Sequence, residues 1–270
     1  MKIGVRAHDY GKQEIEIMAR TLHDEGYECA QIALPKAFKE IESYEDINLA
    51  KIDRIRTAFE KWQVEIPVLG CYMDLGNPDD EIRKKAVEIF KKCLMYNKEL
   101  GAKVVGTETA YGYLSREEKR LWYPYMLDSI KRIVDEAVRL DVKVALEPVY
   151  GHPLEGLEEV LDVMEQIHEE QHLRMIFDAS NLLEFPDKTE QYKYWTKWLT
   201  ETGKYIEAMH IKDFLIDENG QHHFLPLGKG IVEYQAISEW LHHNKPDMFL
   251  LREEMNPLEA KEDILFMKNM

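Results

Sequence analysis

Residues 64–106 read VEIPVLGCYMDLGNPDDEIRKKAVEIFKKCLMYNKELGAKVVG, and this stretch contains the repeating unit of the fold. An apolar run at 64–70 precedes a long amphipathic segment at 78–100, and a second apolar run follows at 102–106. The long segment starts in Asn-Pro-Asp-Asp and stops at Gly101, which are ordinary start and stop signals of a helix. Short β-rich apolar runs are typical of buried strands, so the stretch predicts strand, helix, strand.

The same alternation covers the rest of the chain in both directions. We expect strands at residues 2–6, 27–33, 64–70, 102–106, 142–147, 173–177, 205–211 and 248–252. We expect helices at 13–25, 47–62, 78–100, 116–140, 154–169, 190–202 and 232–243, with a last one running to the C-terminus. This number of units predicts a parallel sheet closed into a single α/β domain, a (β/α)8 TIM barrel over residues 1–270. An open doubly wound sheet is the alternative, but no G-x-G-x-x-G follows the first strand.

The composition excludes several classes of partner. The 35 Lys and Arg residues stand against 51 Asp and Glu residues, so the net charge of −16 weighs against nucleic acid. No apolar run approaches the roughly 20 residues of a membrane span, and the early charges Lys2 and Arg6 do not suit a secretory leader. We therefore expect a cytoplasmic protein without a membrane partner, whose three cysteines are reduced, buried thiols.

Ionisable residues end four successive predicted strands in the second half of the chain. They are Glu147, Asp178, His210 and the pair Glu253-Glu254. Residues past the C-terminal strand ends line the mouth of a barrel, and neighbouring strands lie about 4.8 Å apart, so these groups can converge. Each alone is more often a helix cap, a surface ion pair or an interior histidine. Together they form an oxygen-rich set that suits one divalent ion. Mn²⁺ or Mg²⁺ fits this set better than it would fit a thiolate-rich zinc site, and the one His also tolerates Co²⁺, Fe²⁺ or Zn²⁺.

The sequence segments around these ionisable residues match the motifs of a known superfamily. The segments are Leu146-Glu147-Pro148, Phe177-Asp178, His210-Ile211-Lys212-Asp213, Leu227-Gly228-Lys229-Gly230 and the Glu pair. The chain resembles the xylose isomerase-like TIM-barrel superfamily, and within it the sugar phosphate isomerase/epimerase branch with ketose 3-epimerases and inosose dehydratases. The resemblance implies that Glu147, Asp178, His210 and a strand-eight Glu bind one metal, often Mn²⁺. Dimers and tetramers are common among such proteins, so a homo-oligomer is open.

Two positions depart from the pattern or leave it undecided. Strand alternation allows only one of Glu253 and Glu254 to face the mouth. We favour Glu254, which stands three residues before Pro257, a spacing common in relatives, and Glu253 stays open. Many ketose epimerases have a His shortly after the sixth-strand Asp, where this chain has Asn181, so contacts to substrate oxygens would differ.

The predicted function is a metal-dependent isomerase or epimerase of a small sugar or sugar phosphate. It would remove a proton α to a carbonyl and pass through an enediolate, with Glu147 and Glu254 as the two bases and the metal as Lewis acid. Lys212, Asn181, His8 and Glu108 are the candidate substrate contacts. The alternative to a substrate contact is a structural ion pair with Asp213 or Glu147 for Lys212, a plain surface position for His8 and capping of the next segment for Glu108. Gly228-Lys229-Gly230 would either bind phosphate or form a plain turn.

Three other functions fit the same scaffold. An inosose-type dehydratase or lyase would share the metal and the first proton removal, and only its product would differ. An abasic-site endonuclease needs several additional His ligands, and the third and fourth strand ends offer Cys71, Tyr72 and Glu108 instead. A non-catalytic barrel that binds sugar would use its metal for stability alone, and fold analogy by itself cannot decide against it.

Overall fold

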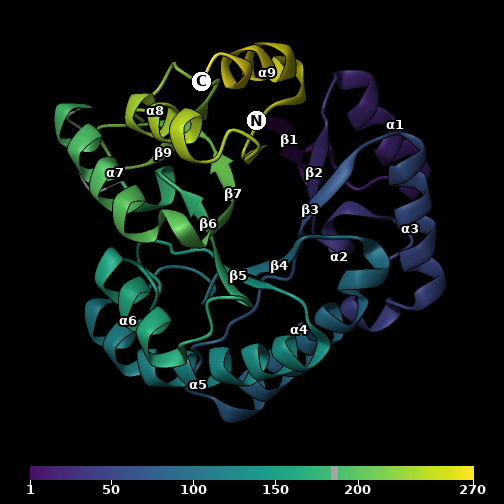
Figure 1. Cartoon of the computed structure of the whole chain (residues 1–270), viewed down its shortest axis with the longest axis vertical. Helices are drawn as coiled ribbons and strands as arrows, with labels where there is room; N and C mark the ends of the chain where they lie inside the picture. Colours follow the sequence, from purple (N-terminus) through teal and green to yellow (C-terminus); the bar gives the residue numbers. More distant parts are fainter. Residues whose placement is uncertain (184–187) are drawn as a thin grey trace.

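The computed structural model describes residues 1–183 and 188–270, and its strands close into a barrel surrounded by helices (Figure 1). The strand order is β1-β10-β7-β6-β5-β4-β3-β2, and every neighbouring pair is parallel. The predicted (β/α)8 TIM barrel is confirmed. The barrel strands are Lys2–Arg6 (β1), Cys29–Ile32 (β2), Glu65–Gly70 (β3), Val104–Thr107 (β4), Val144–Leu146 (β5), Leu173–Asp178 (β6), Ile206–Ile211 (β7) and Phe249–Arg252 (β10).

The outer helices of the described residues follow the predicted segments with shifts at their starts, except for a short helix at Leu34–Ala37 that was not predicted. They are Ile15–Glu25 (α1), Leu34–Ala37 (α2), Leu49–Lys61 (α3), Asp80–Leu100 (α4), Arg116–Leu140 (α5), Leu157–Ile167 (α6), Lys188–Thr202 (α7), Gln235–Asn244 (α8) and Ala260–Lys268 (α9). Capping explains where α4 begins: Asp79 Oδ1 accepts the backbone N–H groups of Glu81 and Ile82. The helices expected from 154 and 232 begin three residues later, because apolar residues in the preceding loops imitate the helical period.

An antiparallel hairpin of Asp213–Ile216 (β8) and His222–Leu225 (β9) follows β7 directly, where the sequence analysis expected no element. Its turn is held by Asp217, whose Oδ1 accepts the N–H groups of Asn219 and Gln221, and Gly220 supplies a φ of +79°. Strands of four residues carry too few alternations to be separated from a loop by pattern alone.

The barrel interior is filled by one small apolar cluster, to which seven of the strands contribute a side chain. Its members are Cys29, Val68, Val104, Ala145, Ile176, Ala208 and Leu251. The eighth strand contributes Gly4, where a Cβ would overlap Cys29. Because side chains alternate along a strand, residues two positions after each member also point into the barrel, nearer its C-terminal mouth. This layer is where the chemistry is found.

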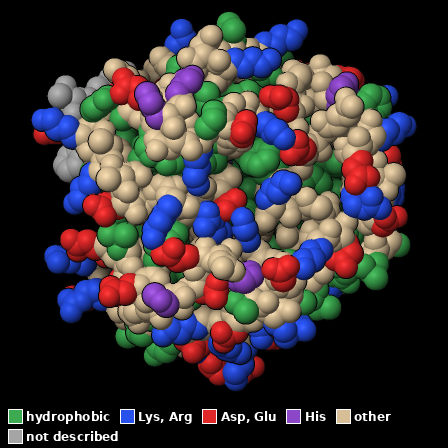
Figure 2. All heavy atoms as spheres, in the orientation of Figure 1, with side chains coloured by type: hydrophobic (Ala, Val, Ile, Leu, Met, Phe, Trp, Pro, Cys, Tyr) green, Lys and Arg blue, Asp and Glu red, His purple; other side chains and the backbone are tan. Residues whose placement is uncertain are grey.

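The surface and the cysteines agree with the expectations from composition. On the face drawn in Figure 2, acidic side chains are interspersed with Lys and Arg around the rim. Cys29, Cys71 and Cys93 are buried free thiols, as predicted. None of the helices in the described ranges is both long enough and apolar enough to span a bilayer.

Candidate metal centre

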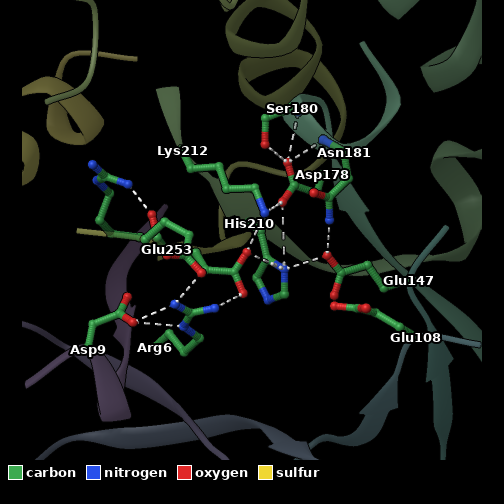
Figure 3. A network of polar contacts seen from close by, with 12 residues as sticks. Arg6, Asp9, Glu108, Glu147, Asp178, Ser180, Asn181, His210, Lys212 and Glu253 are labelled. Atoms are coloured by element: carbon green, nitrogen blue, oxygen red, sulfur yellow. Dashed lines mark hydrogen bonds and ion pairs between the residues drawn. The ribbon is translucent and has the colours of Figure 1, made fainter. Parts of the chain in front are cut away.

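Four buried side chains meet at the C-terminal end of the barrel: Glu147, Asp178, His210 and Glu253. One ligand atom of each lies within 4.8 Å of the others, and Figure 3 shows them pointing toward a common centre. Each stands two residues after a member of the interior cluster, on β5, β6, β7 and β10 or directly behind it. Because side chains two residues apart lie on the same face of a strand, the polar groups of four neighbouring strands meet at the C-terminal end of the barrel interior.

His210 stands against the three carboxylates of this group. Its Nδ1 lies 3.0 Å from Glu147 Oε1, 4.0 Å from Asp178 Oδ2 and 3.9 Å from Glu253 Oε2. Its Nε2 lies 2.6 Å from Oε1 of Gln31, a fully buried residue of β2. A carbonyl oxygen only accepts, so Nε2 carries the proton that it donates, and Nδ1 is the nitrogen turned toward the carboxylates. Sequence reasoning missed Gln31, although its position two residues after Cys29 could have indicated it.

The eighth barrel strand corrects one expectation. Glu253, not Glu254, occupies the place beside His210: the Glu253 side chain is 5% exposed and that of Glu254 is 39% exposed. Alternation counted from the interior residue Leu251 leads to Glu253, and Glu254 has a left-handed φ of +53°, which turns the chain away from the mouth. The spacing to Pro257 that favoured Glu254 does not reflect this local turn.

Arg6 at the end of β1 holds both glutamates in place. Its Nη1 donates to Glu253 Oε1 at 2.8 Å, and its Nη2 donates to Glu254 Oε1 at 2.8 Å and Asp9 Oδ1 at 2.6 Å. The fork of a guanidinium suits such simultaneous contacts. Arg6 was not among the predicted site residues. Its position two residues after Gly4, on the same face of β1, could have indicated it.

Lys212 lies among the same carboxylates. Its Nζ is 2.7 Å from Glu253 Oε2 and 3.1 Å from Asp178 Oδ2. Burial would lower the pKa of Lys212, but the charges of Asp178 and Glu253 raise it well above its usual value. Burial would likewise raise the pKa of Glu253, but Lys212, His210 and Arg6 hold it well below its usual range. Lys212 is thus ion-paired with Asp178 and Glu253 rather than with Asp213 or Glu147, the partners considered for a structural role, and both partners belong to the candidate centre.

The donor set fits a divalent cation. In the described part of the chain no hydrogen bond reaches the buried Glu147 Oε2, and the buried Asp178 Oδ2 has its ion pair with Lys212 but no hydrogen bond of good geometry. Burial raises the pKa of Glu147, which records the cost of an ionised carboxylate here. Burial would lower the pKa of His210, but Glu147 and Glu253 raise it to about 9. Three carboxylates and one imidazole nitrogen converge, and this donor set could hold one divalent cation.

The remaining predicted contacts lie around this group at different distances. Asn181 Nδ2 donates to Glu147 Oε1 at 2.8 Å. Glu108 points toward Glu147 (Figure 3), and burial, together with the Glu147 and Glu253 charges, raises its pKa to about 8. His8 follows β1, and burial next to Arg6 lowers its pKa to about 3. Asn181 thus contacts the candidate ligand Glu147, and Glu108 points toward it. His8 lies near Arg6 instead.

His152 should make the folded chain sensitive to acid. Burial lowers its pKa to about 4, whereas an unfolded chain has a His pKa of about 6.5. Its contribution is therefore complete above pH 6.5 and lost as the pH falls toward 4, by about 2 kcal/mol at pH 5. Denaturant unfolding at pH 7 and pH 5 should show a smaller difference for His152→Gln than for the unchanged chain. An equal pH dependence in the two proteins would contradict the assignment.

The Gly228-Lys229-Gly230 turn is not free to bind phosphate with its backbone. The Asp213 carboxylate accepts the N–H groups of Gly228 at 3.0 Å, Gly230 at 2.8 Å and Val232 at 3.1 Å. A Cβ at Gly230 would collide with that carboxylate, so only glycine permits the approach. The phosphate alternative is corrected: the anion that this turn encloses is the chain's own Asp213.

Asp213 should consequently stabilise the loop that follows β7. Asp213→Ala leaves these N–H groups, of which that of Val232 is buried, without their acceptor and should lower the free energy of unfolding by about 3 kcal/mol. Asp213→Asn keeps one carbonyl acceptor and should lose less. Urea unfolding of both variants measures the difference, and equal stabilities of all three proteins would show that the turn is held by other contacts.

The chain is similar in sequence or in structure to several known proteins. An L-ribulose-5-phosphate 3-epimerase, UlaE, from Escherichia coli is 24% identical over 171 residues, which are 62% of this chain and 55% of UlaE. The match thus spans about half the length of that relative. The structure of the 3-keto-D-glucoside 4-epimerase YcjR from E. coli superposes with a TM-score of 0.77 at 16% identity, covering 100% of both chains. That of the IOLI protein with a bound zinc atom gives 0.74 at 18% identity, covering 100% of this chain and 96% of the other.

A match to a protein-family model identifies the family of this chain. The model described as xylose isomerase-like TIM barrel matches residues 19–270, nearly the whole chain. The closed barrel and the four converging strand ends agree with that match. This chain therefore belongs to the xylose isomerase-like TIM barrel family.

Proposed function

We propose that this chain is a divalent-metal-dependent sugar isomerase or epimerase that removes a proton α to a carbonyl. The observation that carries the proposal is the buried convergence of Glu147, Asp178, His210 and Glu253. The relatives named above as epimerases support the reaction class. Mn²⁺ is the ion we propose, because three of the four ligands are carboxylates. Bound there, it would act as a Lewis acid toward the oxygens of an enediolate.

The protein's own groups would move the proton. Glu147 and Glu253 approach the centre from β5 and β10, which are separated by β6 and β7 in the barrel. Two carboxylates on different sides of a substrate carbon can remove a proton from one face and return it to the other. Glu147 keeps Oε2 free of hydrogen bonds from the described residues, while His210 and Asn181 hold its Oε1. This arrangement leaves one oxygen available as a base.

Two further groups would orient the substrate. The Lys212 ammonium lies where an oxyanion would need a positive charge, and it is held there by Asp178 and Glu253. Glu108, whose pKa burial and the charges of Glu147 and Glu253 raise to about 8 in the metal-free chain, could accept a hydrogen bond from a substrate hydroxyl or donate one to it. Arg6 positions Glu253 and need not touch the substrate.

The test is exchange of substrate hydrogen with solvent. The full chain, stripped of metal and reloaded with Mn²⁺, is incubated in D₂O with a panel of ketoses, inososes and their phosphates. We expect metal-dependent deuterium incorporation at a carbon next to the carbonyl. Mass analysis then separates an epimerase or isomerase from a dehydratase, because only the latter loses water. No exchange with any of these sugars, despite full metal loading, would refute the proposal.

A further inference from the structure

A second binding region adjoins the candidate metal centre. A cavity of about 470 Å³ adjoins it through Ser180, Asn181 and Lys212, which we call the floor of the cavity. Ser180 N and Asn181 Nδ2 donate to Asp178 Oδ1 and Glu147 Oε1, both at 2.8 Å. A ligand whose reacting carbon lies at the metal centre would therefore extend into this cavity, and small-molecule sites are commonly of this size.

The walls of the cavity are aromatic and apolar. The hairpin forms one side with Phe214, Ile216, His222 and Phe224, and two loops form the other with Tyr113 and Tyr150. Ile216, Phe224, Tyr113 and Tyr150 are 49%, 43%, 74% and 60% exposed, which is unusual for such large side chains. Aromatic faces on two sides of an open slot suit a flat ring with apolar C–H faces.

Contacts among the lining residues and with their neighbours hold these walls in place. The Phe214 ring stacks on His222 with centroids 4.6 Å apart and an interplanar angle of 17°. Gly151 lies directly beneath the Tyr113 ring, where no Cβ would fit, and Lys119 Nζ lies 5.4 Å from the centre of the Tyr150 ring. Tyr150 N donates to the carbonyl of Asn181 at 2.9 Å, which ties this wall to the floor. The slot exists before a ligand enters.

The charges of the cavity disfavour a phosphate. Among its described lining residues, Lys212 is the one Lys or Arg, and two carboxylates already pair with it. The nearby backbone N–H groups of Gly228 and Gly230 are used by Asp213. Among the described lining residues, a phosphate dianion would therefore find no Lys or Arg that is free of carboxylate partners.

We infer that this cavity is a stacking subsite for a neutral second ring, so that the substrate is an unphosphorylated glycoside rather than a sugar phosphate. This inference rests on the proposed function for the position of the reacting sugar. The subsite is formed by Tyr113 and Tyr150 on one side and by the inner face of the hairpin on the other.

The hairpin supplies a matched pair of variants. Phe224 on β9 lines the cavity, whereas Leu215 on β8 alternates to the outer side, and both side chains are 43% exposed. Replacing either by Ala removes a comparable share of exposed apolar surface from the same two strands. Only Phe224→Ala changes the wall of the subsite.

The experiment measures binding of three inert probes to the full chain by calorimetry, with Mn²⁺ and after its removal. The probes are methyl β-D-glucopyranoside, phenyl β-D-glucopyranoside and D-glucose 6-phosphate. We expect the phenyl glucoside to bind about tenfold more tightly than the methyl glucoside and the phosphate to bind most weakly. Phe224→Ala should lose the phenyl preference, and Leu215→Ala should keep it.

The possible outcomes separate this inference from the proposed function. A phenyl preference that Phe224→Ala abolishes supports the subsite even if no metal-dependent exchange is found. Normal exchange combined with tightest binding of the phosphate, or a phenyl preference that ignores Phe224, overturns the subsite alone. Sedimentation of both variants is the last control. A dimer that Phe224→Ala dissociates without changing probe affinities would assign the hairpin to a second copy of the chain and overturn the inference.

Discussion

Glu147→Gln and Glu253→Gln should each lower kcat/KM by at least about 1000-fold, whereas Glu254→Gln should lower it by less than about tenfold. Both buried glutamates would lose a base as well as a metal ligand, because an amide neither accepts the proton nor carries the charge. Glu254 pairs with Arg6 at the rim, and its side chain is 39% exposed. The measurement is steady-state epimerisation of whichever sugar gives exchange, made with Mn²⁺ at saturation.

The adjacent pair of glutamates makes this comparison informative. Thermal unfolding of the three variants controls for misfolding, and metal content controls for loss of the ion. If Glu254→Gln were as inactive as Glu147→Gln while Glu253→Gln stayed active, the strand-eight role would return to Glu254. That result would also require the left-handed turn at Glu254 to be rearranged in solution.

Metal binding should stabilise the chain strongly. With Mn²⁺ at 100 times its Kd, the free energy of unfolding should rise by about 2.7 kcal/mol, which corresponds to roughly 5–10 °C in Tm. The physical reason is that only the folded chain brings the four ligands together, so the ion binds the folded state and not the unfolded one. Asp178→Asn should remove most of the response, and Glu254→Gln should retain it. Calorimetric unfolding with and without chelator gives the shift.

The same binding should release a proton. The pKa of His210 is about 9 in the metal-free chain, so this imidazole holds a proton at pH 7 that a metal must displace from Nδ1. Apparent affinity should therefore rise about tenfold per pH unit between pH 7 and 9. Titrations in two buffers of different ionisation enthalpy count the proton. No Tm shift and no heat at millimolar Mn²⁺ would mean that the four strand ends are structural.

The barrel and three of its converging residues could be predicted from local patterns. Glu147, Asp178 and His210 end apolar runs, and parallel strands bring their C-terminal ends to one edge whatever the loops do. The strand period and the helix period are properties of short segments, so they can be read without knowledge of distant contacts. The same local reading is too coarse for the hairpin β8–β9, whose strands have four residues each.

Local patterns did not decide whether Glu253 or Glu254 faces the centre, and only the tertiary structure decided it. Leu251 faces the barrel interior, and a left-handed φ at Glu254 ends the strand, so Glu253 is buried beside His210. Arg6 and Gln31 complete the centre from the first two strands, and Gln31 lies 179 residues from His210. A period of two residues dictates which side chains share a face, but closure of the barrel decides which strands meet. The sequence by itself therefore determined the barrel and its strand ends, while barrel closure and one backbone turn determined which charges surround the centre.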